Sequence, residues 1–121
     1  MMDTRPNTVF CDIDGTLVQH CKPTELQKPN HKLVLLPGTV DKLLEWDKAG
    51  CIIILTTGRK ESLRKVTERQ LWEAGIIYDQ LIMGISGGKR YLINDRKPQG
   101  EEDYAIAINL KRNEGIEGLN I

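Results

Sequence analysis

Short apolar runs alternate with helical patterns along the first two thirds of the chain. The runs Asn7–Ile13 and Cys51–Leu55 are rich in β-branched residues and predict buried strands. Apolar residues recur at helical spacing over residues 39–49 and 61–74, and a glycine follows each stretch, as is common at helix ends. Strands and helices that alternate at this spacing predict an α/β fold: a small, doubly wound, Rossmann-like parallel sheet in three layers.

Later segments extend this pattern less clearly. The apolar runs 81–83 and 91–93 predict two more strands, separated by the glycine-rich residues 84–88. Residues 104–110 fit either a helical turn or a strand, and the turn-like residues that follow favour a strand. Residues 17–36 are polar and contain two prolines, which predicts a long loop or flap in place of a periodic helix.

Size and charge narrow the class of protein. A chain of 121 residues has room for one core, so we expect a single domain over residues 1–121. Its 17 basic and 17 acidic residues cancel, which argues against nucleic acid as the default partner. No apolar run approaches the length of a membrane span or a secretory signal, and the three cysteines fit unpaired thiols, so we expect a cytoplasmic protein.

Polar residues follow three of the predicted strands. The segments are Asp12-Ile13-Asp14-Gly15-Thr16, Thr56-Thr57-Gly58-Arg59 and Asn94-Asp95-Arg96-Lys97. Ligands bind at the carboxyl ends of the strands in open α/β sheets, so these segments predict one site. Asp12 and Asp14 leave an extended chain on the same face, and Asp95 adds a third negative charge there. A divalent cation, most naturally Mg²⁺, relieves this repulsion and recruits a phosphate ester as substrate.

The Asp12–Thr16 motif, in register with Thr56 and Asp95 at two other strand ends, resembles the haloacid dehalogenase (HAD) superfamily of phosphatases. The resemblance covers residues 7–110 and implies that Asp12 is the nucleophile and Asp14 the general acid and base. It implies that the Thr56 hydroxyl binds a phosphoryl oxygen. It also implies that Asp95, with Asp12 and the main-chain carbonyl of Asp14, binds Mg²⁺.

The position of the expected lysine remains open. Family order points to Lys89, but a strand over residues 90–94 would place Lys89 roughly 20 Å from the site, at about 3.3 Å per residue. Lys97 follows Asp95 on the correct side, so we prefer Lys97 and keep Lys89 as the alternative. Arg59, with Thr57 and Gly58, is expected to contact the substrate.

These features together predict a Mg²⁺-dependent phosphomonoester hydrolase that acts through an aspartyl phosphate. Neither usual position for a cap domain carries a large insertion, which predicts a capless enzyme with an open site. A small phosphorylated metabolite, such as a phosphosugar, is the expected substrate, and polynucleotide or protein phosphate is the alternative. A homo-oligomer in which a neighbour serves as lid fits the open site. A catalytically silent HAD-like module that only binds phosphate and metal is the competing hypothesis.

Overall fold

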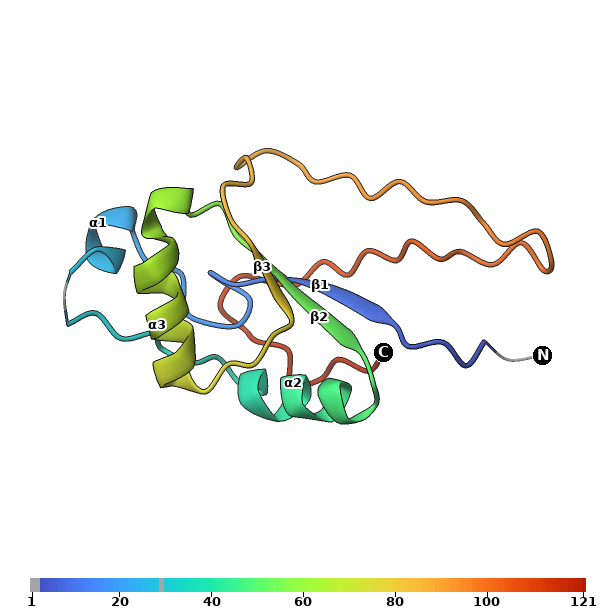
Figure 1. The fold of residues 1–121 in the computed structure, drawn as a ribbon, viewed down its shortest axis with the longest axis horizontal. Helices are drawn as coiled ribbons and strands as arrows, with labels where there is room; N and C mark the ends of the chain where they lie inside the picture. The colour runs from blue at the N-terminus through green and yellow to red at the C-terminus, as the bar shows by residue number, and fades with distance from the viewer. Residues whose placement is uncertain (1–2, 29) are drawn as a thin grey trace.

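The structure is a computed structural model that describes residues 3–28 and 30–121. Its sheet contains the parallel strands β1 (Thr8–Asp12), β2 (Ile52–Thr56) and β3 (Gln80–Ile82), in the order β1-β2-β3 (Figure 1). The register pairs Asp12 with Thr56, the last residues of β1 and β2. The fold is therefore the open, Rossmann-like α/β architecture that the sequence predicts, and the strands over residues 7–13, 51–55 and 81–83 are confirmed to within a residue or two.

The helices follow the predicted pattern. Helix α2 (Thr39–Lys48) connects β1 to β2, and the 3-10 helix η1 (Glu61–Leu63) leads directly into α3 (Arg64–Ala74). Gly75 ends α3 in the left-handed region at φ 77°, where glycine carries no steric penalty. The helices predicted over 39–49 and 61–74 are confirmed. Within the described residues, no helix has the length and apolar character to cross a bilayer.

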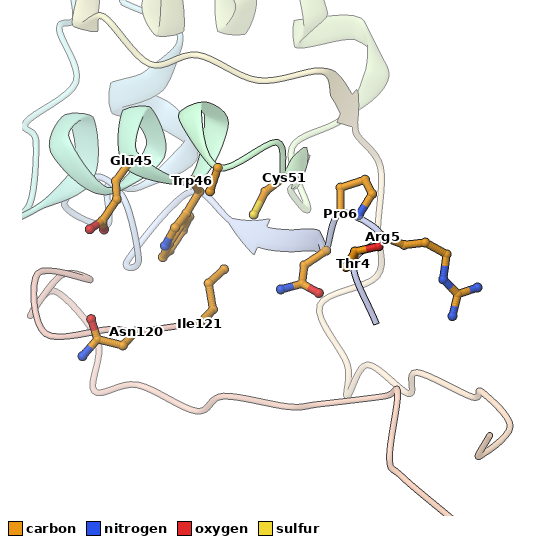
Figure 2. Close-up of a pocket in the computed structure, with 10 residues that line it drawn as sticks. Thr4, Arg5, Pro6, Glu45, Trp46, Cys51, Asn120 and Ile121 are labelled. Carbon is orange, nitrogen blue, oxygen red and sulfur yellow. The ribbon is translucent and has the colours of Figure 1, made fainter. Parts of the chain in front are cut away.

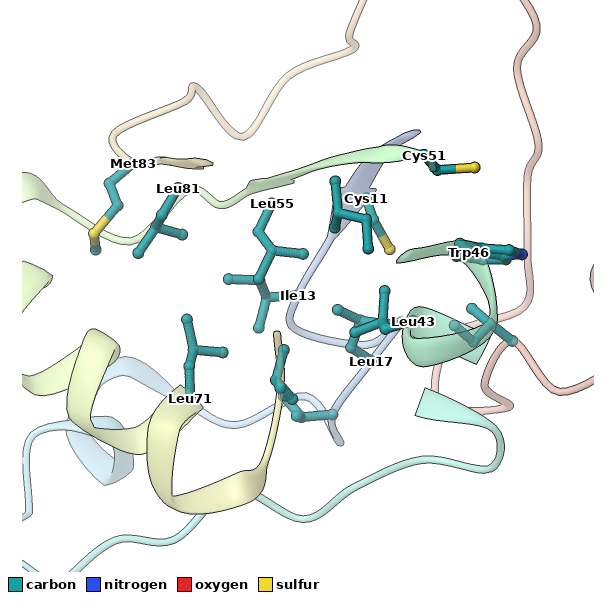
Figure 3. Packing of buried hydrophobic residues seen from close by; sticks show 14 residues of the cluster. Cys11, Ile13, Leu17, Leu43, Trp46, Cys51, Leu55, Leu71, Leu81 and Met83 are labelled. Carbon is teal, nitrogen blue, oxygen red and sulfur yellow. The ribbon is translucent and has the colours of Figure 1, made fainter. Parts of the chain in front are cut away.

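One hydrophobic cluster joins the sheet to both long helices (Figure 3). Ile53 and Leu55 of β2 are fully buried between Leu43 of α2 and Leu71 of α3. Burying a side chain of this size stabilises the fold by about 1.5–3 kcal/mol. Strand residues that alternate with the cluster remain exposed, including Phe10 at 54%. The cluster fixes the ends of β1 and β2 against each other, and these ends carry the candidate site.

In the described part of residues 17–36, the structure has the short helix α1 (Pro23–Leu26) and no other helix or strand. The Leu36 N–H donates to the Leu17 carbonyl at 3.0 Å and closes the base of this segment. Leu26 is buried and anchors the flap.

Residues 85–112 form a two-limbed arm, with an outgoing limb (85–97) and a return limb (102–112) (Figure 1). The strands expected over 91–93 and 104–110 do not form, so this prediction is wrong. A strand needs a neighbour for its backbone groups. Among the described residues, the ladder contacts recorded in the arm lie near its tip, around the bridge Arg96–Asp103.

The outgoing limb runs antiparallel to β1. It begins beside the carboxyl end of β1, where Arg90 contacts Asp12. Near the tip of the arm, the Tyr104 hydroxyl donates to Asp3, which precedes β1, at 2.7 Å. The return limb then runs back with β1 and arrives at Gly15, whose carbonyl accepts the Asn113 N–H at 2.8 Å.

Candidate active site

Asp12 is the last residue of β1 and lies beside Thr56, the last residue of β2. Its side chain is 36% exposed, and the Thr16 hydroxyl donates to its Oδ2 at 3.5 Å. Gly15 makes the sharp turn after the strand at φ 88°, and its N–H donates to the Val18 carbonyl. The sequence therefore places one accessible carboxylate and one threonine at the same edge of the sheet.

Asp14 is held by a bidentate ion pair. Arg59 Nε donates to Asp14 Oδ2 at 3.0 Å, and Nη2 donates to Oδ1 at 2.8 Å. The remaining nitrogen, Nη1, donates to Thr67 Oγ1 at 3.2 Å and to Gln70 Oε1 at 2.8 Å on α3. The Arg59 side chain is only 4% exposed. Its hydrogen bonds go to protein acceptors, so in this structure Arg59 orients Asp14, and the expected contact of Arg59 with the substrate stays a prediction.

The hydrogen bonds continue from Arg59 to the flap. The Gln70 Nε2 donates to the carbonyl of Leu26, in α1, at 3.2 Å. Gln70 and Thr67 are both fully buried, so water competes little with these bonds. The orientation of Asp14 therefore depends on α3 and on the seating of the flap.

Thr57 and Gly58, which are also expected to contact the substrate, shape the loop after β2. Thr57 is 1% exposed, and its Oγ1 accepts the Arg59 N–H at 3.1 Å. A Cβ at Gly58 would lie 3.2 Å from the Ile85 carbonyl oxygen, which favours glycine at this close approach. Thr56, in contrast, is partly exposed at the strand end beside Asp12.

The structure brings Arg90, and not Lys97, to Asp12. Arg90 Nη1 lies 3.3 Å from Asp12 Oδ1. Lys97 lies at the tip of the arm, 4.7 Å from the centre of the Tyr104 ring, beside the amino end of β1. Our preference for Lys97 rested on a strand that does not form. Lys89 is the direct neighbour of Arg90, so the distance argument against it fails as well.

Asp95 is not brought to Asp12 and Asp14. It lies on the outgoing limb, where the Asn94 side-chain amide donates to it at 3.3 Å. The limb runs toward the amino end of β1 and carries this carboxylate away from the site. Over residues 3–28 and 30–121, no group of three or more His, Cys, Asp or Glu side chains is positioned to hold a metal ion.

Besides Arg90, two further residues near the site, Arg112 and Asn113, were missed from the sequence. The Arg112 side chain lies against Gly15, where an added Cβ would be 3.2 Å from its Cγ. Asn113 Oδ1 accepts the His20 N–H at 2.8 Å and fastens the return limb to the chain after Asp14. Neither residue belongs to a motif, and both contacts join segments far apart in sequence, so no local signal marked them.

Shifted pKa values occur next to the site and at the arm tip. Burial, assisted by the charge of Asp12, raises the pKa of the Cys11 thiol to about 12. The hydrogen bond to Asp3 raises the pKa of Tyr104 above its usual value. Cys11 is therefore a neutral core residue directly before Asp12.

The described cavities lie away from Asp12. One of about 330 Å³, lined by Thr4, Arg5, Trp46 and Cys51 among others, lies near the amino ends of β1 and β2 (Figure 2). A second, of about 580 Å³, lies between the flap residues Lys32 and Leu33 and the α3 residues Gln70 and Trp72. Asp12 itself is reached from open solvent at the sheet edge.

Comparisons with known proteins support the fold. No protein-family model matches the chain, and no curated protein matches it. A chain in the structure of the Pnkp1/Rnl/Hen1 RNA repair complex is 31% identical, with a TM-score of 0.57 over 70% of this chain and 28% of that one. A structural-genomics target from Vibrio cholerae is 18% identical, with a TM-score of 0.52 over 84% of this chain and 90% of that one.

A D,D-heptose 1,7-bisphosphate phosphatase from B. bronchiseptica, complexed with magnesium and phosphate, is 18% identical at a TM-score of 0.46, over 64% of this chain and 49% of that one. The chain spans less than one third of the length of the RNA repair chains that it matches. At the level of fold, the first two likenesses support the HAD-like architecture that the Asp12–Thr16 motif implies.

Proposed function

We propose that this chain is a HAD-type phosphatase that hydrolyses phosphomonoesters with Mg²⁺ through an aspartyl phosphate on Asp12. The observation that carries the proposal is the arrangement at the sheet edge. An accessible Asp12 stands beside Thr56, and Asp14, two residues later, is oriented by a buried arginine. The 31% identity to a chain of an RNA repair complex supports the same class.

In the first step, an Asp12 carboxylate oxygen attacks phosphorus, and the bond from phosphorus to the ester oxygen breaks. Asp14 donates a proton to the departing alcohol. In the second step, water attacks the phosphorus of the aspartyl phosphate while Asp14 takes the proton, and the carboxylate of Asp12 is released with inorganic phosphate. Both oxygens of Asp14 accept hydrogen bonds from Arg59, which fixes the position of the carboxyl group; one oxygen gives up its bond to Arg59 when it carries the proton in this exchange.

Arg90 and Thr56 bind the phosphoryl group in this proposal. The Arg90 guanidinium contacts Asp12 and is the cation that can meet a phosphoryl oxygen there. The Thr56 hydroxyl supplies a neutral donor from the neighbouring strand. Lys89, next to Arg90, is the second cationic candidate.

The residues present fit Mg²⁺. This ion keeps several waters and needs only one or two carboxylates besides the substrate phosphate. Asp12, exposed at the strand end, and the main-chain carbonyl of Asp14 would hold the ion, with Asp95 as a further ligand once it reaches this edge. The bound ion would neutralise charge on the transferring phosphoryl group.

A colorimetric assay tests the proposal. Wild type should release p-nitrophenol from p-nitrophenyl phosphate with Mg²⁺, and excess EDTA should abolish the release. Asp12→Asn removes the nucleophile and should abolish it as well, whereas Asp41→Asn, on the exposed side of α2, should leave it unchanged. A folded wild type without metal-dependent release would favour the silent binding module.

The substrate class divides into two candidates. A small phosphorylated metabolite such as a phosphosugar is the first candidate, with a neighbouring subunit as lid over the open site. The 31% identity to a chain of an RNA repair complex favours a phosphate on a polynucleotide end as the second candidate. Comparing kcat/KM for a panel of sugar phosphates with that for end-phosphorylated oligonucleotides separates them, and a thousandfold preference for either class decides the question.

A further inference from the structure

The arm exposes a large amount of apolar surface. Its large hydrophobic side chains include Ile93 at 91% exposure and Tyr91 at 83%. The full set is Tyr91, Leu92, Ile93, Tyr104, Ile106, Ile108 and Leu110. Their exposures range from 37% to 91%, so together the seven present on the order of several hundred Å², comparable with the about 800 Å² per partner that a stable interface buries. Apolar surface on this scale marks an interaction site.

A complementary surface lies on the same molecule. Strand β1 is the edge of the sheet, and within the described residues it pairs with β2 alone. Its free edge presents unpaired backbone groups, and Phe10 beside them is 54% exposed. The limbs of the arm have β-favouring sequences and equally free backbone groups, so an arm segment can add to β1 as a new strand.

The direction of the outgoing limb argues for a second copy of the chain. Within one chain, this limb runs antiparallel to β1, from Asp12 toward the amino end of the strand. A two-fold axis perpendicular to the strands reverses that direction. The partner's outgoing limb then runs parallel to β1, with its Asp95 end toward Asp12. Two-fold dimers are also the commonest assemblies of identical chains.

We propose that the arm docks on the free edge of β1 in a second copy of this chain, forming a two-fold dimer with exchanged arms. Each site then receives Asp95 of the partner subunit beside its own Asp12. The catalytic part of this inference rests on the proposed function, whereas the dimer itself does not. The exchange accounts both for the exposed apolar arm and for the distance of Asp95 from Asp12 within one chain.

Sedimentation equilibrium tests the dimer without any reference to activity. Wild type at micromolar concentration should sediment at twice the mass of the chain. Ile93→Asp places a charge in the docked limb and should give a folded monomer, as checked by circular dichroism. Trp72→Asp is the matched control, because Trp72 is 85% exposed on α3, outside the arm, and the variant should remain dimeric. A monomeric wild type, or a dimeric Ile93→Asp, overturns the proposal.

Subunit complementation tests the shared site. Asp12→Asn and Asp95→Asn should each be inactive on p-nitrophenyl phosphate, and co-refolding the two should restore about one quarter of wild-type activity. Half of the dimers are then mixed, and each mixed dimer has one intact site of two. A dimer without this recovery refutes the shared site. A dimeric wild type that is inactive alone refutes the proposed function and leaves the arm exchange standing on sedimentation.

Discussion

Replacing Arg59 by leucine should destabilise the protein far more than replacing an exposed arginine. Arg59 makes two hydrogen bonds to Asp14, one to Thr67 and one to Gln70, at 2.8–3.2 Å. The substitution keeps an apolar stem of similar size but leaves a carboxylate, a hydroxyl and an amide oxygen without their donor. The loss of stability therefore comes mainly from the unpaired carboxylate and the lost hydrogen bonds, and only slightly from poorer packing.

The size of the effect follows from burial. Removing one partner of a buried ion pair costs about 3–5 kcal/mol. Asp14 keeps 18% exposure and can recover some hydration, which places the expected loss near the lower limit, about 3 kcal/mol. The free energy of unfolding of a native domain is about 5–15 kcal/mol, so the variant should remain folded but with a smaller free energy of unfolding.

Urea unfolding followed by circular dichroism measures the loss. With a slope of about 2 kcal/mol per molar urea, the midpoint for Arg59→Leu should fall by about 1.5 M. Arg69→Leu, which removes an exposed pair with Glu73, should shift it by less than about 0.5 M. Asp14→Asn combined with Arg59→Leu should recover part of the loss, because the unpaired charge is gone. A loss below about 1 kcal/mol, or no recovery in the double variant, would refute the buried network as described.

Three further predictions concern single positions. Gly38→Ala should lower the free energy of unfolding by more than about 2 kcal/mol, because φ is 84° and a Cβ would lie 2.4 Å from a backbone Cα of the C-terminal segment. Gly75→Ala is the control: it has open space around it and should lower the free energy of unfolding by only about 1 kcal/mol. Equal losses for the two variants in thermal unfolding would contradict this prediction. Thr56→Val should lower kcat/KM for p-nitrophenyl phosphate about 10- to 100-fold at unchanged stability, whereas Thr57→Val should mainly lower stability, by about 1 kcal/mol. The reverse pattern, in which Thr57→Val lowers kcat/KM and Thr56→Val lowers stability, would show that Thr57 contacts the phosphoryl group and would contradict this prediction. Cys11 should resist alkylation by iodoacetamide at pH 8 until urea unfolds the chain, and rapid labelling of the native protein would contradict the burial of its thiol. The stability that the neutral thiol contributes should be present below about pH 9 and be lost as the pH rises toward 12.

The sequence was sufficient to predict the strands and helices that pack against elements adjacent to them in the fold. Strands β1 and β2 and helices α2 and α3 form βαβ units, in which each apolar stripe packs against an element that is adjacent in the unit. The carboxyl-end rule then placed Asp12 next to Thr56 without further information.

The arm and the Asp14 network could not be predicted in this way. The run 91–93 has the composition of a strand, but composition does not name the neighbour that must satisfy its backbone. Arg59 was recognised as a cation of the site, yet its partner lies 45 residues away and its other acceptors lie on the buried side of α3. Side-chain orientation on α3 decided its role, and a motif carries no information about that.

Trapping the phosphorylated enzyme tests the central claim most directly. Asp14→Asn should accept the phosphoryl group from p-nitrophenyl phosphate, a good leaving group, but should lose the base that assists the second step. After acid quenching, peptide mass mapping should find a phosphoryl group on the peptide that contains Asp12, and Asp12→Asn should show none. Turnover by wild type with no phosphorylated Asp12 in the quenched variant, or phosphate on another residue, would contradict the account.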